Sequence, residues 1–144
     1  MEKTRGETMI IVVDTNIAIA AILKRSTTQE ILFNPELEPY APEFIGEEII
    51  KHRQELMKKS GDTENKFYTI LSLVLSRITI VREEKYAMHK EYVLKFTPDK
   101  MDWPFLALAK NLNAVLWTND RRLREGQNEI RIVTTEELVK LLKI

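Results

Sequence analysis

The chain has 144 residues, no cysteine, and a formal net charge of zero from 22 basic and 22 acidic side chains. Without thiols it cannot form disulfides, use a cysteine nucleophile, or hold zinc or an iron–sulfur cluster through thiolates. Zero net charge excludes a general attraction to nucleic acid, so any polyanion binding must come from a local basic patch. The length fits one domain with its own core.

The first eight residues are polar and carry charges of both signs, unlike a signal peptide. The apolar stretch that follows, residues 9–23, is interrupted by Asp14 and Asn16 and is too short and too polar for a membrane span. We therefore predict a polar extension over residues 1–8, a single domain over residues 9–144, and a cytoplasmic protein without membrane contact.

Short apolar runs alternate with amphipathic stretches along the chain. The runs predict strands or extended pieces at residues 9–13, 39–41, 78–81, 114–117 and 130–133. Helices are predicted at residues 15–24, 28–33, 42–60, 83–96 and 102–112. A further helix begins after a cap at Asp62 or Thr63 and has its apolar face from Phe67 to Leu75, and the last helix begins at Thr134 and extends to Leu142. Pro42 fits the first turn of the predicted helix 42–60, and Gly61 fits its end. Thr134 and Glu137 are spaced as a capping box at the start of the last helix. The alternation predicts an α/β fold, a three-layer α/β/α sandwich around a mainly parallel sheet.

Three aspartates fall where such a fold binds ligands, at the carboxyl ends of its strands. Asp14 directly follows the first strand, and Asp120 follows the strand that ends at Trp117. Asp102 begins the helix that leads into that later strand. We expect these carboxylates to lie at one edge of the sheet.

A fourth acid comes from the predicted helix 42–60. Its apolar positions repeat every three or four residues from Ile45 to Leu56, and Glu48 borders the face that they form. Glu47 lies nearer the flank of the helix. Glu48 is therefore the better candidate for pointing at the sheet edge, with Glu47 as the alternative.

Each acid also has a purely structural interpretation. Asp14 and Asp102 can cap their helices, Glu48 can be a solvated helix charge, and Asp120 can be a turn residue. Asp99 is expected to be a turn or cap residue. Together, however, converging carboxylates repel one another, and a divalent cation relieves that repulsion. Oxygen ligands without cysteine or histidine favour Mg²⁺ or Mn²⁺ over zinc.

Four segments occur in order over nearly the whole chain: Ile11-Val-Val-Asp14-Thr-Asn16, Glu48, Asp102-Trp-Pro-Phe-Leu-Ala-Leu-Ala109 and Trp117-Thr-Asn-Asp120. This set resembles the acidic signature of PIN domains, which are metal-dependent ribonucleases. Many small PIN domains are VapC-type toxins paired with an antitoxin. The resemblance implies that Asp14, Glu48, Asp102 and Asp120 are catalytic and form the Mg²⁺ or Mn²⁺ site. It also implies a homodimer and an antitoxin partner.

Other side chains are candidates for supporting roles. Asn16 and Thr118 can orient the carboxylates, whereas Thr15 and Asn119 can equally be turn residues. The candidates for contacts with the RNA backbone are Lys24, Arg121, Arg122 and Arg124. For each of these basic side chains the alternative is a solvated helix face. We expect His52 to be a packing or surface residue.

The expected function is a divalent-metal-dependent endoribonuclease acting on single-stranded or structured RNA. The alternative is a catalytically silent PIN-like module that binds RNA or protein, which the neutral net charge keeps open. A phosphatase of the haloacid dehalogenase type is disfavoured because Asn16 stands where that chemistry needs a second aspartate. Nucleotide cofactors are disfavoured because the glycine-rich phosphate-binding motifs do not occur.

Overall fold

A computed structural model describes residues 8–23 and 26–144, in which five strands form one sheet in the order β3-β2-β1-β4-β5. The strands are β1 (Met9–Val13), β2 (Leu37–Pro42), β3 (Thr79–Val81), β4 (Val115–Trp117) and β5 (Ile132–Val133). All four pairings between neighbouring strands are parallel. The predicted α/β fold with a parallel central sheet is confirmed.

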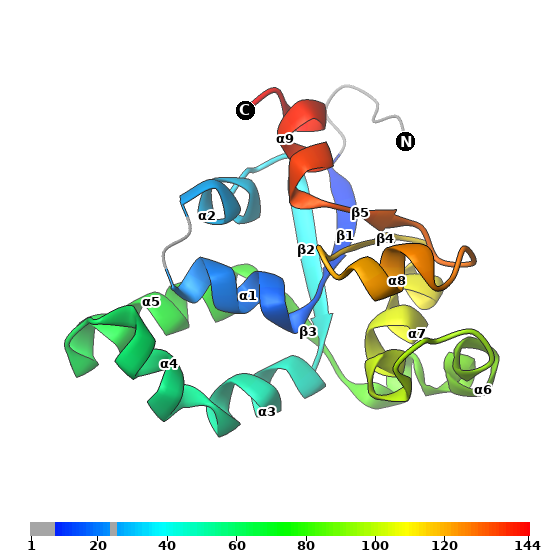
Figure 1. The fold of residues 1–144 in the computed structure, drawn as a ribbon, viewed down its shortest axis with the longest axis horizontal. Helices are drawn as coiled ribbons and strands as arrows, with labels where there is room; N and C mark the ends of the chain where they lie inside the picture. The colour runs from blue at the N-terminus through cyan, green and yellow to red at the C-terminus, as the bar shows by residue number, and fades with distance from the viewer. Residues whose placement is uncertain (1–7, 24–25) are drawn as a thin grey trace.

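Helices cover both faces of this sheet. They are α1 (Thr15–Ile22), α2 (Ser26–Leu32), α3 (Phe44–Lys51), α4 (Arg53–Ser60), α5 (Glu64–Arg77), α6 (Lys90–Leu94), α7 (Trp103–Leu112), α8 (Arg121–Glu125) and α9 (Thr135–Leu142). Three short 3₁₀ turns precede α6 and α7: η1 (Glu83–Lys85), η2 (Ala87–His89) and η3 (Lys100–Asp102). Figure 1 shows α1 and α2 on one side of β1 and β2, and α6 and α7 on the other. The three predicted layers are therefore present.

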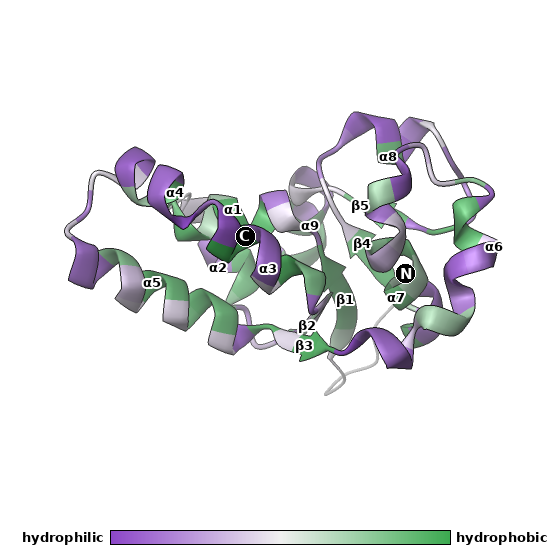
Figure 2. Cartoon of the chain, turned by 90° about the horizontal axis from the view of Figure 1, so that it is seen from below, coloured by the Kyte–Doolittle hydropathy of each residue, from purple (hydrophilic) through white to green (hydrophobic). Residues whose placement is uncertain are grey.

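The core forms around β1 and α7. Ile11, Val12 and Val13 are fully buried, as expected for a strand without polar alternation that is covered on both faces. Helix α7 packs across β1, β2 and β4 with its buried residues from Pro104 to Ala109. In Figure 2 the central strand β1 is coloured as hydrophobic, whereas much of α4 is hydrophilic.

The order of the strands creates a crevice beside β1. From β1 the chain moves to β2 and then to β3 on one side, and it returns to form β4 on the other side. In open parallel sheets, the carboxyl ends of the two strands that flank such a reversal form the usual ligand-binding crevice. Here these ends are followed by Asp14 and by Thr118 to Asp120.

The prediction of one helix over residues 42–60 is wrong. Pro42 ends β2, where it pairs with Val81 of β3, and the helical residues form α3 and α4 on either side of His52. A proline at a strand end and a proline in a first helical turn look alike locally, and only the neighbouring strand distinguishes them. At the break, Arg53 Nη1 donates to the carbonyl oxygen of Ile50 at 2.9 Å, which satisfies one exposed acceptor.

The single helix predicted over residues 83–96 is also wrong. The segment forms η1, η2 and α6 in place of one continuous helix, with Tyr86 and Val93 buried and Met88 exposed. Helix α8 was not predicted at all. It has only five residues and begins at the cap that Asp120 provides.

The predicted helix boundaries agree with the structure where the sequence contains a residue typical of a helix cap. Gly61 ends α4 with a left-handed φ of 69°, a conformation that glycine adopts at little cost. Thr63 caps α5, and Thr134 with Glu137 forms the predicted capping box of α9. Residues 1–7 lie outside the described part, so the division into residues 1–8 and 9–144 stays a prediction. No helix of the described part is long and apolar enough to cross a membrane.

The close packing at Gly126 generates a testable prediction. A Cβ at this position would lie 2.4 Å from the carbonyl oxygen of Arg122 and 2.6 Å from Cγ of Pro98. We expect Gly126→Ala to lower the free energy of unfolding by about 1–3 kcal/mol, because backbone must shift. The matched control is Gly46→Ala in α3, where a Cβ meets nothing within 4 Å.

Gly46→Ala should raise the free energy of unfolding by about 0.5–1 kcal/mol, because alanine favours a helix. Urea unfolding of both variants measures the difference. Equal effects of the two substitutions would contradict the packing described around Gly126.

Candidate active site

A cavity of about 210 Å³ opens at the carboxyl ends of β1 and β4. Its lining residues are Asp14, Thr15, Asn16, Ile19, Glu48, His52, Asp102, Phe105, Asp120 and Leu123. The structure thus brings the four predicted acids together from four separate parts of the chain. Their role as catalytic residues and ligands stays a prediction.

Asp14 is the most deeply buried of the four acids, with 7% of its surface exposed. Its backbone N–H donates to the carbonyl oxygen of Trp117 at 3.3 Å, which joins the ends of β1 and β4. Its Oδ1 accepts the N–H of Ile17 at 2.9 Å, and the carboxylate also accepts the Thr118 hydroxyl and the Asn16 N–H. Burial, with a smaller contribution from Asp120, raises the pKa of Asp14 from 3.8 to about 6. Asp14 therefore caps α1 and lines the cavity at once.

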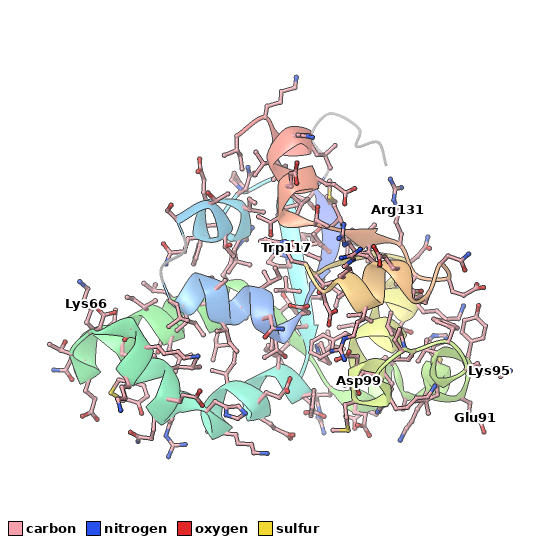
Figure 3. All side chains as sticks on the ribbon, in the orientation of Figure 1. Lys66, Glu91, Lys95, Asp99, Trp117 and Arg131 are labelled. Carbon is pink, nitrogen blue, oxygen red and sulfur yellow. The ribbon has the colours of Figure 1, made fainter. Side chains whose placement is uncertain are left out.

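Asp102 stands at the N-terminus of α7, but its carboxylate makes no capping hydrogen bond. The alternative that Asp102 caps its helix is wrong. Asp99, labelled in Figure 3, caps the turn η3 that precedes α7. Its Oδ1 accepts the N–H of Met101 at 3.0 Å, which confirms the prediction of a turn or cap residue. Burial and the charges of Asp99, Asp120 and Asp14 raise the pKa of Asp102 to about 6.

Asp120 caps α8, with its Oδ1 accepting the N–H of Arg122 at 2.9 Å. Its Oδ2 lies 3.5 Å from Nη2 of the same arginine. The Asp120 N–H donates to Oγ1 of Thr118 at 3.0 Å. The fully buried Thr118 hydroxyl contacts both Asp14 and Asp120, and its role in orienting metal ligands stays a prediction.

Glu48 and Glu47 occupy different environments. Glu48 is half-buried in the cavity with Asp14, whereas Glu47 is exposed and lines a neighbouring cavity. Thr15 Oγ1 donates to Oε1 of Glu48 at 2.6 Å, and this bond fixes the carboxylate relative to the start of α1. Sequence reasoning left Thr15 as a possible turn residue, and only its position next to Asp14 signalled its contact.

The remaining candidates divide between the cavity and the scaffold. Asn16 lines the cavity and supports Asp14 through its backbone N–H. Asn119 belongs to the scaffold: its Oδ1 accepts the N–H of Thr135, and its Nδ2 donates to Oγ1 of Thr135. Trp117, labelled in Figure 3, is fully buried and donates its indole N–H to the same oxygen at 3.0 Å. His52 lines the cavity with a side chain that is 52% exposed.

The basic residues differ in how freely they can meet a ligand. Arg121 pairs with Glu125 at 3.0 Å along α8, and Arg122 pairs with Asp120. Arg124 is exposed on the same short helix. Lys24 lies outside the described residues, so its predicted contact stays a prediction.

The donor set can be compared with the needs of a metal ion. Among the described residues, no three carboxylate or imidazole groups already surround one point in coordinating geometry. Asp14, Glu48 and Asp120 instead accept hydrogen bonds from the local partners Ile17, Thr15 and Arg122. Mg²⁺ keeps several of its waters and needs only one or two direct carboxylates, so a cavity of oxygen donors that are not yet closed around a point fits Mg²⁺ or Mn²⁺.

The raised pKa of Asp14 predicts that its charge opposes folding. The folded protein binds this proton more tightly than the unfolded chain does, so the penalty is absent below pH 3.8 and complete above about pH 6. Without divalent metal at about pH 8, Asp14→Asn should raise the free energy of unfolding by up to about 3 kcal/mol, because Asn keeps the capping oxygen.

Urea unfolding in EDTA at about pH 8 and about pH 4 measures this effect. The gain should disappear at the lower pH, where the native carboxyl is also neutral. A variant that is less stable than the native chain at both pH values would contradict the stated cause.

Comparison with known proteins places the chain in a family. The family model described as PIN domain matches residues 12–142. Similar solved structures include VapBC2 from Rickettsia felis bound to a DNA fragment from its promoter, with a TM-score of 0.67 and 18% identity over 88% of this chain and 98% of that chain. A toxin–antitoxin complex from Klebsiella pneumoniae has a TM-score of 0.63 and 17% identity over 87% and 97%.

PAE2754 from Pyrobaculum aerophilum has a TM-score of 0.66 and 17% identity over 98% of this chain and 95% of that chain. At such identities these structures establish the shared fold alone. The comparison with curated protein sequences gives no match. Because the family model spans nearly the whole chain, the protein belongs to the PIN domain family.

Proposed function

We propose that the protein is a divalent-metal-dependent endoribonuclease that hydrolyses phosphodiester bonds of RNA. PIN domains are generally nucleases, and such nucleases generally use divalent metals. The observation that supports the proposal most directly is the meeting of Asp14, Glu48, Asp102 and Asp120 in one cavity. Burial, with smaller contributions from neighbouring carboxylates, raises the pKa of Asp14 and Asp102 to about 6, so the charged forms of both are disfavoured in the cavity.

The four acids would hold Mg²⁺ or Mn²⁺, directly or through water. When bound, such an ion lowers the pKa of a coordinated water and neutralises charge on the phosphate. Other residues of the protein would orient these acids. The Thr118 hydroxyl hydrogen-bonds to Asp14 and Asp120, and the Thr15 hydroxyl donates to Glu48. Asp102, without a capping bond, has its carboxylate free for the cavity.

RNA would approach over α8, where Arg121, Arg122 and Arg124 follow Asp120. These residues, with Lys24, are the proposed contacts to the phosphate backbone. Their number is small, in keeping with the zero net charge of the chain.

We further propose a toxin role, with an antitoxin as partner, a homodimer as the assembly and the cytoplasm as the location. Support comes from two similar structures, VapBC2 from Rickettsia felis and a toxin–antitoxin complex from Klebsiella pneumoniae. The competing proposal is a silent module that binds RNA or protein. It is weakened because helix capping accounts for Asp14 and Asp120 but not for Asp102 and Glu48, which line the same cavity.

The proposal predicts cleavage that depends on metal and on the four acids. Purified protein should cleave single-stranded RNA with Mn²⁺ or Mg²⁺ and lose this activity in EDTA. Asp14→Asn and Asp102→Asn should each lower kcat by at least about 100-fold, beyond the range of residues that only orient ligands. Glu48→Gln should lose more activity than Glu47→Gln.

The matched control is Glu136→Gln on α9, an exposed acid that pairs with Lys140 and does not line the cavity, and it should retain full activity. If native protein bound no divalent ion and cleaved no RNA in a broad panel, the silent-module proposal would replace the nuclease. If Asp102→Asn and Asp120→Asn cleaved as fast as the native chain, the activity would belong to another site or a contaminant.

If RNA lies over α8, loss of an arginine there should weaken the binding of RNA without slowing the cleavage of bound RNA. Arg124→Ala should raise KM about threefold and reduce the slope of log affinity against log salt by about one, with kcat retained. Arg131→Ala, an exposed arginine just before β5, is the control. Equal salt slopes for Arg124→Ala and the native chain would contradict this path.

A further inference from the structure

Arg122 of α8 lies beside the cavity at the carboxyl ends of β1 and β4, called the first cavity below. Among the residues that the structure describes, it is the only basic side chain that forms an ion pair with one of the four acids of this cavity. The other arginines of α8 differ: Arg121 pairs with Glu125, and Arg124 has no ion pair within the described chain. The fold therefore directs a single cation at these carboxylates.

Both carboxylate oxygens of Asp120 are in contact with Arg122, but with different parts of it. Oδ1 accepts the backbone N–H of Arg122 at 2.9 Å, which is the bond that caps α8. Oδ2 lies 3.5 Å from Nη2 of the guanidinium and has no other polar contact among the described residues. Oδ2 is thus the oxygen that remains for a metal ion, and the guanidinium already faces it.

The charge of Arg122 also acts on a second acid. It lowers the pKa of Asp102, against the larger upward effects of burial and of the neighbouring aspartates. Asp102 forms no ion pair within the described chain, so this effect acts through space. One guanidinium therefore stabilises the charged forms of two acids, as a divalent cation between them would do more strongly.

The contact between Arg122 and Asp120 is weak enough to be displaced. The Arg122 side chain is 70% exposed and that of Asp120 is 22% exposed, so water screens the pair. Exposed ion pairs contribute little free energy, whereas a divalent cation carries twice the charge and prefers carboxylate oxygens. An exposed guanidinium can also turn away from Asp120 without becoming a buried, unpaired charge.

We propose that Arg122 is a positioning residue that competes with the divalent cation for Oδ2 of Asp120. Without metal, the guanidinium holds this carboxylate toward α8. When Asp120 turns to an ion, directly or through water, the guanidinium is released beside the cavity and becomes available to a phosphate group. The inference rests on the proposed nuclease, and it adds that Arg122 contacts RNA only after it has left Asp120.

Titration of the full chain with Mn²⁺ alone, followed by electron paramagnetic resonance, tests the competition. Arg122→Gln should lower the dissociation constant for Mn²⁺ about threefold, because it removes the competing cation and keeps the backbone cap. Arg122→Lys keeps the charge and should stay closer to the native chain. The matched control is Arg124→Gln, which removes the same charge from the same helix and should leave the dissociation constant nearly unchanged.

The outcomes separate this inference from the proposed function. Tighter binding cannot come from misfolding, and adding Asp14→Asn to Arg122→Gln should abolish the gain if it belongs to the first cavity. Equal effects of Arg122→Gln and Arg124→Gln would overturn the inference and leave the nuclease proposal intact. An absence of Mn²⁺ binding in both the native chain and Arg122→Gln would overturn both.

Side-chain NMR tests the release of the guanidinium without reference to affinity. The Nε–H signal of Arg122, identified by its absence from Arg122→Gln, should shift when Mg²⁺ is added to saturation. The signal of Arg131, which is labelled in Figure 3 and does not line the first cavity, should stay in place. An Arg122 signal that does not move while Mg²⁺ binds would overturn the inference.

Discussion

The site depends on one constraint: carboxylates are buried together at one edge of a parallel sheet, where desolvation and, to a smaller extent, mutual repulsion disfavour their charged forms. Asp14 cannot move away, because its N–H is bonded to Trp117 across β1 and β4 and its carboxylate is bonded to Ile17. Asp120 is tied to the same place through the Thr118 hydroxyl. The backbone therefore sets where these carboxylates lie. Because they are buried there, the pKa values of Asp14 and Asp102 are raised. A divalent cation is the ligand that would lower the energy of this arrangement most.

The fold tolerates the charges without a metal because three helices begin at the cavity. Asp14, Asp102 and Asp120 stand at the N-termini of α1, α7 and α8, where the positive end of each helix dipole favours a negative charge. Asp14 and Asp120 each use one oxygen to cap a helix. Capping and ligand binding are thus compatible roles of the same side chain, so the structural interpretation of these aspartates does not compete with the functional one.

The parts of the fold and site that follow from local chemistry were predictable from sequence. The unbroken apolar run of β1 located the strand and therefore Asp14, and helix periodicity favoured Glu48 over Glu47. Features set by distant contacts were not predictable: Pro42 ends a strand because Val81 pairs with it.

Anomalous diffraction from crystals soaked in Mn²⁺ tests the central claim most directly, because it locates the ion without reference to activity. We predict a manganese peak in the first cavity, with oxygens of Asp14 and Asp102 as its nearest protein ligands and Asp120 and Glu48 directly bound or one water away. A peak elsewhere on the molecule, or no peak between these carboxylates at saturating Mn²⁺, would contradict the assignment of this cavity as a metal-dependent active site.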